Sequence, residues 1–349
     1  MIAARTAWCV VFALAAPFAG AACAHSAELA DVAPPPRPPA APAKKDRVVP
    51  APLFTFSAHD AGVVALALSP DARTLVTAGA DEPTAKVWDL AGRKFRCDLA
   101  QSFPVTGLAF SPDGKRLATS SALAKVTSDG NFLTHGQLLV WDAATCKQLG
   151  APMPDARLVD HVAWSPDGKL LACVESKARK VRLFDAGTSA FLRAFDASDA
   201  STATLAFFPD GRTLAVTRDD GVDLWDVASG AARAQLQSPT AALAIAPDGR
   251  TFATASGRDV TWWRADGEHV RSVKALGESG NALAFFPDAR RLISGGDAAT
   301  LDVWSSASGE RTQTLRAHDD AVSALAIAKD GTVLVSGARD GGVAVWALE

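Results

Sequence analysis

The sequence predicts an all-β fold in which seven similar units form one ring, and three observations lead to this expectation. An apolar stretch followed by a Pro-Asp turn, or by Lys-Asp in the last copy, occurs seven times. Each copy is followed by an apolar stretch that ends in an aromatic residue. No helical periodicity interrupts this pattern. Because four short strands per ~40–45 residues make one blade of a β-propeller, we expect a seven-bladed propeller of four-stranded antiparallel blades.

The first 24 residues are expected to be a signal peptide and not part of the fold. Arg5 is the only charged residue before Glu28, and residues 7–19 form an apolar run. This run is too short to span a membrane, which needs ~20 apolar residues. A basic start, a short apolar run and a stretch of small residues are typical of a secretory leader.

Two cleavage points fit the small residues at positions 20–24. Cleavage after Ala24 leaves His25 as the first residue. Residues 20–23 also resemble the lipobox of bacterial lipoproteins, which makes Cys23 a candidate lipidation site, although Gly20 stands where that pattern usually has an aliphatic residue. Either cleavage predicts an exported protein that is periplasmic or lipid-anchored to the bacterial envelope.

Residues 25–52 are expected to form an extended linker. They contain prolines at positions 34, 35, 36, 38, 39, 42, 50 and 52. Proline fixes φ and removes a backbone donor, so this segment favours neither a helix nor a sheet ladder. The segment is expected to be a spacer of ~3.1 Å per residue, and the alternative is a ligand for an aromatic groove.

Each of the seven units in residues 53–349 is expected to consist of strands joined by turns. The first strand precedes an Asp-Gly or Asp-Ala turn, which favours a tight reversal of the chain. A second strand follows, the third carries the aromatic residue, and a fourth leads to the next unit. The residues before the turn Asp are Pro70, Pro112, Pro166, Pro209, Pro247, Pro287 and Lys329.

The ends of this region predict how the ring closes. The seventh unit stops at Glu349, just after its third strand. The segment Leu53–His59 precedes the first strand of unit one and has the position of a fourth strand without a unit of its own. We expect it to complete the last blade, because that pairing removes an open sheet edge.

The paired signatures resemble those of the WD-repeat (WD40) family over residues 53–349. The third strands end in Lys-Val-Trp-Asp at Asp89, Leu-Val-Trp-Asp at Asp142 and Asp-Leu-Trp-Asp at Asp226. One such signature is weak evidence, but seven paired signatures at a steady period are strong evidence. The resemblance implies a propeller that binds other proteins.

The resemblance also implies a supporting tetrad of His, Ser or Thr, Asp and Trp, which satisfies buried polar groups across one blade. Unit one keeps His59 and Trp88 but has Ala78 at the hydroxyl position and Glu82 at the Asp position, and the intermediate units lack the His. Unit seven matches the whole tetrad, with His318, Ser336, Asp340 and Trp346.

Composition and motifs argue against an enzyme. The formal net charge of −3 gives no overall attraction to nucleic acid or to an acidic membrane surface. The six His have no zinc-type spacing, and no nucleophile, metal or phosphate-loop motif follows the leader. The repeated turn Asp residues share one structural position, which favours turn formation over metal binding. We therefore expect no catalytic residue, no cofactor and no metal.

The alternative function is a propeller enzyme or small-molecule binder that uses the central channel. His161 is the one candidate acid–base group that we place on an inward strand. Small residues at one repeated position of the first strands let seven strands converge near an axis, but they offer no acid, base or ligand. These residues are Ala67, Ala109, Ala163, Ala206, Ala244, Ala284 and Ala326.

The cysteines give no framework of disulfides. Five Cys in 349 residues are too few for a disulfide scaffold. Cys97, Cys146 and Cys173 follow no repeated spacing. We expect free thiols that are buried or half-buried, with a disulfide among the three left open.

Unit two carries about a dozen extra residues within Ser121–Gly136, between its second and third strands. In the WD-repeat family such loops lie on the face most often used for partners, and unit three has a basic turn beside them. We expect a partner-binding sector with a basic rim and an apolar anchor, and the alternative is a tolerated surface insertion. The candidate residues are Lys125, Phe132, His135, Arg157, His161, Lys177, Arg179, Lys180 and Arg182.

Together these observations favour a non-enzymatic, monomeric scaffold for protein–protein interactions in the cell envelope. Its partners are expected to be proteins and not nucleic acid, and it contacts the membrane only through a lipid on Cys23. A structural component of the envelope differs from this scaffold only in its partner.

Overall fold

The computed structural model describes residues 51–126, 132–153, 159–175, 179–196, 204–218, 220–274 and 280–348. The expected signal peptide, Cys23 and nearly all of the expected linker lie outside these ranges. Within the described residues, no helix is long and apolar enough to cross a membrane.

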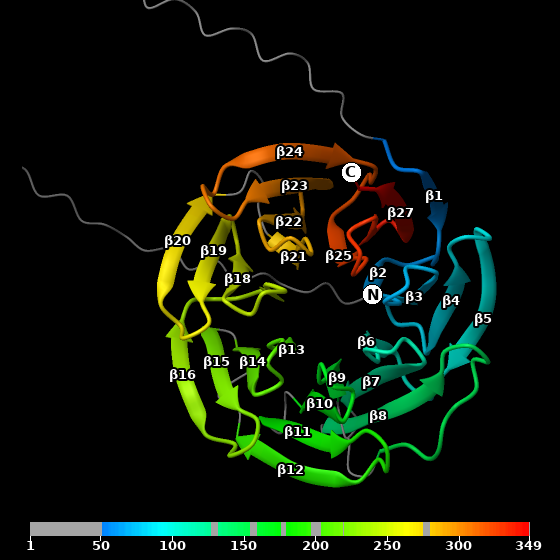
Figure 1. The fold of residues 1–349 in the computed structure, drawn as a ribbon. Helices are drawn as coiled ribbons and strands as arrows, with labels where there is room; N and C mark the ends of the chain where they lie inside the picture. Colours follow the sequence, from blue (N-terminus) through cyan, green and yellow to red (C-terminus); the bar gives the residue numbers. More distant parts are fainter. Residues whose placement is uncertain are drawn as a thin grey trace, which may run out of the picture. The chain divides into compact units, whose positions relative to one another are not determined.

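The described residues fold as a ring of seven antiparallel sheets, which confirms the predicted seven-bladed propeller (Figure 1). We number the blades 1 to 7 along the chain. Blade 1 contains β2 (Val63–Leu68), β3 (Thr74–Gly79), β4 (Thr84–Asp89) and β5 (Lys94–Ala100). Blade 2 contains β6 (Val105–Phe110), β7 (Arg116–Val126) and β8 (Phe132–Asp142). Blade 3 contains β9 (Val159–Trp164), β10 (Leu170–Glu175), β11 (Lys180–Asp185) and β12 (Phe191–Asp196).

The other blades repeat the same order from the axis outward. Blade 4 contains β13 (Leu205–Phe207), β14 (Thr213–Arg218), β15 (Gly221–Asp226) and β16 (Ala232–Gln237). Blade 5 contains β17 (Ala242–Ile245), β18 (Thr251–Ser256), β19 (Asp259–Arg264) and β20 (His269–Lys274). Blade 6 contains β21 (Gly280–Phe285), β22 (Arg291–Gly296), β23 (Thr300–Ser305) and β24 (Arg311–Arg316). Blade 7 contains β25 (Val322–Ile327), β26 (Val333–Ala338), β27 (Gly342–Ala347) and β1 (Phe54–Ser57).

The ring closes as predicted, by a strand from the other end of the chain. β1 pairs antiparallel with β27, in the register Phe54↔Val345 to Ser57↔Gly342. Figure 1 shows β1 in blue beside β27 in red. The pairing gives blade 7 its fourth strand and covers the edge that β27 would otherwise expose.

The first turn of each blade is built by its Asp. In blade 2, the Asp113 carboxylate accepts bonds from the Ser111 hydroxyl and the Lys115 amide. The next residue needs a left-handed backbone, and glycine supplies it in five blades, as at Gly114 (φ 70°). Ala72 (φ 58°) and Ala289 occupy the same position with a side chain.

The core lies between the blades, in seven apolar clusters that each join two neighbours. The cluster between blades 1 and 2, for example, contains Ala67, Val87 and Leu99 from one blade and Leu117 and Trp141 from the next. Most of the repeated alanines pack in these clusters rather than lining an open site. A small side chain is needed there because neighbouring first strands approach closely near the axis.

Blade 2 departs from the four-stranded pattern. Among the described residues its sheet has three strands, and Trp141↔Gln148 is a single isolated bridge where a fourth strand would pair. The Leu149 and Met153 amides donate to the carbonyls of Val140 and Leu138, so this segment follows the edge of β8 irregularly. Gly150 lies between these two bonds and has a left-handed backbone (φ 74°), which a regular strand does not contain.

A disulfide joins blades 1 and 2, so the expectation of free thiols was wrong for two of three cysteines. Cys97 of β5 is bonded to Cys146, 49 residues later, in the turn after β8. Cys173 is a free, buried thiol, as expected. The disulfide ties the irregular outer segment of blade 2 to the regular outer strand of blade 1.

Candidate functional site

The extra residues of unit two lengthen two strands instead of forming a loop. β7 and β8 each have 11 residues, whereas the second and third strands of the other blades have six. The two strands remain paired from Arg116↔Asp142 to Val126↔Phe132. Lys125 and Phe132 therefore lie in this ribbon, although their side chains are outside the described part of the structure.

The base of the ribbon is held by the loop that joins blades 1 and 2. The His135 ring stacks on Phe103, with centroids 5.6 Å apart and planes 8° apart. The Ser102 amide donates to Oε1 of Gln137 at 3.3 Å. Leu123, opposite His135 in the ladder, is 37% exposed. An exposed aromatic and aliphatic surface therefore accompanies the ribbon.

The basic turn of blade 3 lies between β10 and β11, and its described cations are largely balanced. Lys180 Nζ is 2.7 Å from Asp196 Oδ1. Arg182 Nε donates to Oε2 of the buried Glu175 at 2.8 Å. Arg179 is exposed and has a left-handed backbone (φ 53°). Lys177 and Arg157 lie outside the described residues, so the structure shows only part of the expected basic rim.

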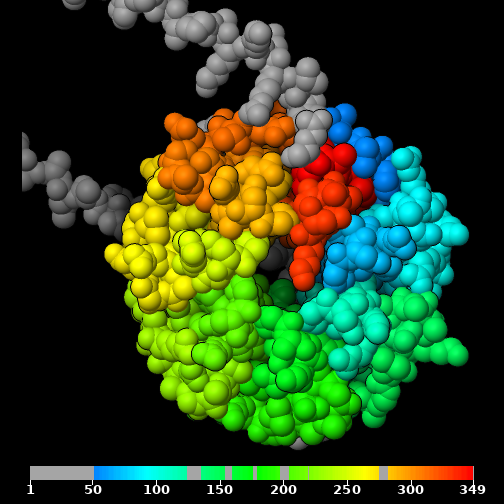
Figure 2. All heavy atoms as spheres, viewed as in Figure 1, coloured from blue at the N-terminus to red at the C-terminus, as the bar shows by residue number. Residues whose placement is uncertain are grey.

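His161 lies on β9, the innermost strand of blade 3. The ring is hollowed at its axis on the face that Figure 2 shows. Desolvation lowers the pKa of the His161 imidazole below its ordinary value, against a smaller opposing effect of Asp160. The side chain is therefore a neutral, partly buried group.

The tetrad residues of blade 7 are brought together. His318 Nε2 is 2.7 Å from the Ser336 hydroxyl, to which the Trp346 indole donates at 3.2 Å. His318 Nδ1 is 3.7 Å from Asp340 Oδ2. Burial lowers the pKa of the His318 imidazole, against a smaller opposing effect of the Asp340 carboxylate.

Blade 1 also has a full set of four, which corrects the assignment of Ala78 to the hydroxyl position. Thr77, one residue earlier, accepts from the Trp88 indole at 2.9 Å and lies 2.9 Å from His59 Nε2. Glu82 replaces the Asp, with Oε2 2.7 Å from His59 Nδ1. Adjacent residues of a strand face opposite sides, so the hydroxyl reaches the Trp only from position 77.

Blade 4 lacks the hydrogen bond from the Trp indole to a Ser or Thr hydroxyl that blades 1, 2, 5, 6 and 7 have. In blade 5 the Trp263 indole donates to Thr254 at 3.0 Å. Val216 holds the equivalent position of β14, and the Trp225 indole nitrogen is buried without a hydrogen-bond partner. Aligning the second strands at the position that hydrogen-bonds to the Trp indole would have revealed the missing hydroxyl from the sequence.

Blades 3 and 4 carry a buried charge pair of reversed polarity that sequence reasoning missed. In blade 3, Glu175 ends the second strand and pairs with Arg182, the third residue of β11. In blade 4, Arg218 ends the second strand and pairs with Asp223, the third residue of β15, at 3.0 Å. Because both pairs bridge the second and third strands, they tie these strands together where the His of the tetrad is missing.

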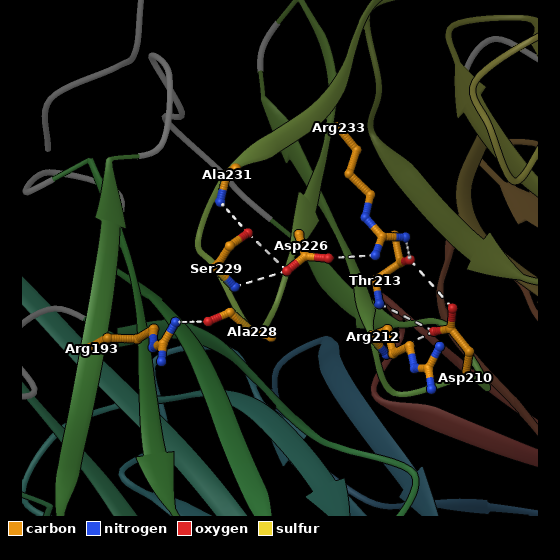
Figure 3. Close-up of polar contacts among 9 residues, drawn as sticks. All are labelled: Arg193, Asp210, Arg212, Thr213, Asp226, Ala228, Ser229, Ala231 and Arg233. Carbon is orange, nitrogen blue, oxygen red and sulfur yellow. Dashed lines mark hydrogen bonds and ion pairs between the residues drawn. The ribbon is translucent and has the colours of Figure 1, made fainter.

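A contact between an outer strand and the turn of the next blade occurs at the same register in blades 1 and 3, and in blade 1 it is the disulfide. Cys97, Arg193 and Arg271 stand at the same register of the outer strands of blades 1, 3 and 5. Arg193 donates to the Ala228 carbonyl in the turn of blade 4, beside the Asp226 carboxylate that holds Ser229 and Arg233 (Figure 3). The disulfide is therefore a covalent form of an inter-blade clamp.

Comparison with known families matches four segments of the chain. Residues 50–89, 94–142, 152–185 and 309–347 match the family described as WD domain, G-beta repeat. The segments cover most of the first three blades and of the last.

Several known proteins are similar to this chain in sequence, and their names differ widely. The chain is 25% identical over 267 residues to the serine-threonine kinase receptor-associated protein of Gallus gallus, which covers 72% of this chain and 69% of that protein. It is 25% identical to pre-mRNA-processing factor 19 homolog 2 of Arabidopsis thaliana, over 50% of this chain and 32% of that protein. It is 26% identical to DNA damage-binding protein 2 of Mus musculus, over 50% of this chain and 43% of that protein. The chain thus spans less than half the length of the latter two.

Proposed function

We propose that this chain, which carries WD40 repeats, is a non-enzymatic scaffold that binds protein partners in the bacterial cell envelope. The observation that carries the proposal is the β7–β8 ribbon. Six other blades close with shorter second and third strands, so the added length is not needed to complete a blade. Binding residues concentrate on segments that connect strands and that the fold itself does not need.

The inner strands support a scaffold rather than a catalyst. Their repeated alanines are used in packing between blades and offer no acid, base or ligand. Each tetrad described above places its polar side chains within a blade, where they satisfy one another. These groups stabilise the ring, and we therefore assign recognition of partners to its surface.

The disulfide supports the proposed export. Disulfides form and persist in oxidising compartments such as the periplasm, and are rare in the cytosol. The Cys97–Cys146 bond is therefore in keeping with a chain that folds after it has crossed the inner membrane. Export and the fate of Cys23 are tested together by mass spectrometry of the mature protein. A first residue His25, or a lipid on Cys23, supports export, whereas an intact Met1 on soluble cytoplasmic protein refutes it.

The binding proposal is tested by trimming the ribbon. Replacing residues 122–136 with the four-residue turn of blade 1, residues 80–83, leaves the register of blade 2 intact, since Ser121 and Gln137 correspond to Gly79 and Thr84. We expect the trimmed protein to melt like the parent and to lose the partner that crosslinks to the parent in intact cells. A trimmed protein that keeps the same partner at unchanged affinity contradicts the proposal.

The role of the basic turn is tested by charge reversal. Changing Lys177, Arg179 and Lys180 to Glu should weaken the same complex, and more so at low salt, because exposed charge contacts are screened at higher ionic strength. The matched control is Arg212→Glu, an exposed turn cation of blade 4 on a different part of the ring. Equal effects of both changes would place the partner elsewhere.

A further inference from the structure

Among the described residues, the outer part of the ribbon has strand edges that no other strand of its blade pairs with. β6 pairs with β7 only up to Val105↔Ser121, and the Ala122 amide then donates to the Pro104 carbonyl. Beyond that point five residue pairs, from Ala122↔Gly136 to Val126↔Phe132, continue as two strands. Within the described ranges, these pairs have strand neighbours only in each other.

The alternation of hydrogen bonding along β8 shows which of its backbone groups face away from β7. On β8, the Asp142 amide and the carbonyls of Val140 and Leu138 all bond outward, to the segment 147–153. In an antiparallel pair such outward groups occur at every second residue. The N–H and C=O groups of Gly136, Thr134 and Phe132 therefore point away from β7 as well.

The same edge of β8 already binds an extended segment further along. Residues 147–153 occupy it at Leu138–Asp142, through one bridge and a few backbone bonds. The disulfide at Cys146 holds the start of this segment in place. The portion Phe132–Gly136 continues this edge in β conformation, with outward donors and acceptors at the spacing of a strand.

From this geometry we infer that the outer edge of β8 at Phe132–Gly136 binds an extended strand of the protein partner by β-strand addition. The inference rests on the proposed scaffold function and gives its mode of recognition. Outward N–H and C=O groups at alternate residues are complementary to the backbone edge of another strand. The exposed Leu123 and His135, which share a face at the base of the ribbon, offer side-chain contacts to alternate residues of that strand.

The test separates main-chain pairing from side-chain recognition. Thr134→Pro removes an outward N–H but breaks no bond to β7, because Thr134 belongs to an outward-facing pair. Ala124→Pro does the same on the opposite edge of the ribbon, and Thr134→Ala changes the side chain while keeping the N–H. The probe is a short synthetic peptide of alternating Val and Thr. Its control is the same peptide with N-methyl groups at alternate residues along one edge.

We expect the parent protein to bind the unmodified peptide and to protect the Gly136 and Thr134 amides from hydrogen exchange. Thr134→Pro and N-methylation should each weaken binding by roughly tenfold or more, through lost main-chain hydrogen bonds. Ala124→Pro and Thr134→Ala should bind like the parent. Circular dichroism and melting temperature check that every variant is folded.

Each contrary result overturns the inference. No peptide binding, or equal binding of the N-methylated peptide, shows that the edge does not accept a strand. Loss of binding in Ala124→Pro alone assigns the strand to β7 instead. Concentration-dependent dimers of the parent that Thr134→Pro abolishes identify a second copy as the occupant. If trimming the ribbon abolishes the native complex but Thr134→Pro leaves it intact, the scaffold function stands and strand addition fails.

Discussion

Replacing Val216 with Thr should stabilise the protein, although the change puts a polar atom into the core. Val216 is 2% exposed, and the buried indole N–H of Trp225 has no hydrogen-bond partner among the described residues. Threonine has the shape of valine and would place a hydroxyl where Thr254 of blade 5 accepts the indole of Trp263 at 3.0 Å.

The expected gain follows from two opposing terms. An unpaired buried donor costs ~1–3 kcal/mol, which the new hydroxyl would recover. Exchanging a buried methyl for a hydroxyl loses about 1 kcal/mol of apolar transfer free energy. The net effect is a stabilisation of about 1 kcal/mol in the free energy of unfolding. At about 2.1 cal/mol/K of unfolding entropy per residue, a ring of about 300 residues should melt roughly 1.5 °C higher.

The assay is urea unfolding of four proteins that form a double-mutant cycle. Val216→Thr, Trp225→Phe and the double variant are compared with the parent, and the cycle isolates the new bond. Thr254→Val in blade 5 is the reciprocal control, which orphans the Trp263 indole and should destabilise by about 1–3 kcal/mol. A destabilised Val216→Thr with no coupling to Trp225, together with a neutral Thr254→Val, would refute the reasoning.

Four further expectations follow from the described contacts. Ala72→Gly should stabilise by about 0.5–1 kcal/mol by relieving a left-handed alanine, and Gly114→Ala should do the reverse, both read from urea midpoints. Cys97→Ser should cost about 4 kcal/mol by the loop-entropy model for 49 residues, and a reductant should destabilise the parent but not this variant. Deleting Leu53–His59 should expose β27, which would be seen as aggregation or a large fall in melting temperature; a deletion variant that melts like the parent excludes closure by β1. Burial lowers the pKa of His59, His161 and His318, so below about pH 6.5 the unfolded chain binds protons that the folded chain does not. The free energy of unfolding should therefore be constant above this pH and fall below it, and a flat profile from pH 7 to 5 would contradict this.

The architecture was predictable because its determinants are local and repeated. An Asp that caps a turn, as Asp113 does, acts through residues within two positions of itself, and seven copies leave little doubt about the period. The closure by β1 was predictable too, because a missing fourth strand at one end matched a spare strand at the other.

The features that were missed depend on where separate blades meet or on a shift of one residue. Thr77 and Ala78 differ by one position, which moves a side chain to the other face of β3. Cys97 and Cys146 meet because an outer strand of one blade lies beside a turn of the next, a relation that no spacing within one repeat contains. The lengthening of β7 and β8 was expected as a loop, because the extra residues could be counted but their pairing with each other could not.

The pairing of β1 with β27 also sets an order of events when the chain is made. Phe54 is synthesised almost three hundred residues before Val345, its partner in the ladder. Until the later strand emerges, β1 has no sheet to join, and its Phe54 and Phe56 lack the valines of blade 7 in the apolar cluster that covers them. The ring is therefore the last element to be completed, and the contact that completes it has a high contact order, which slows folding.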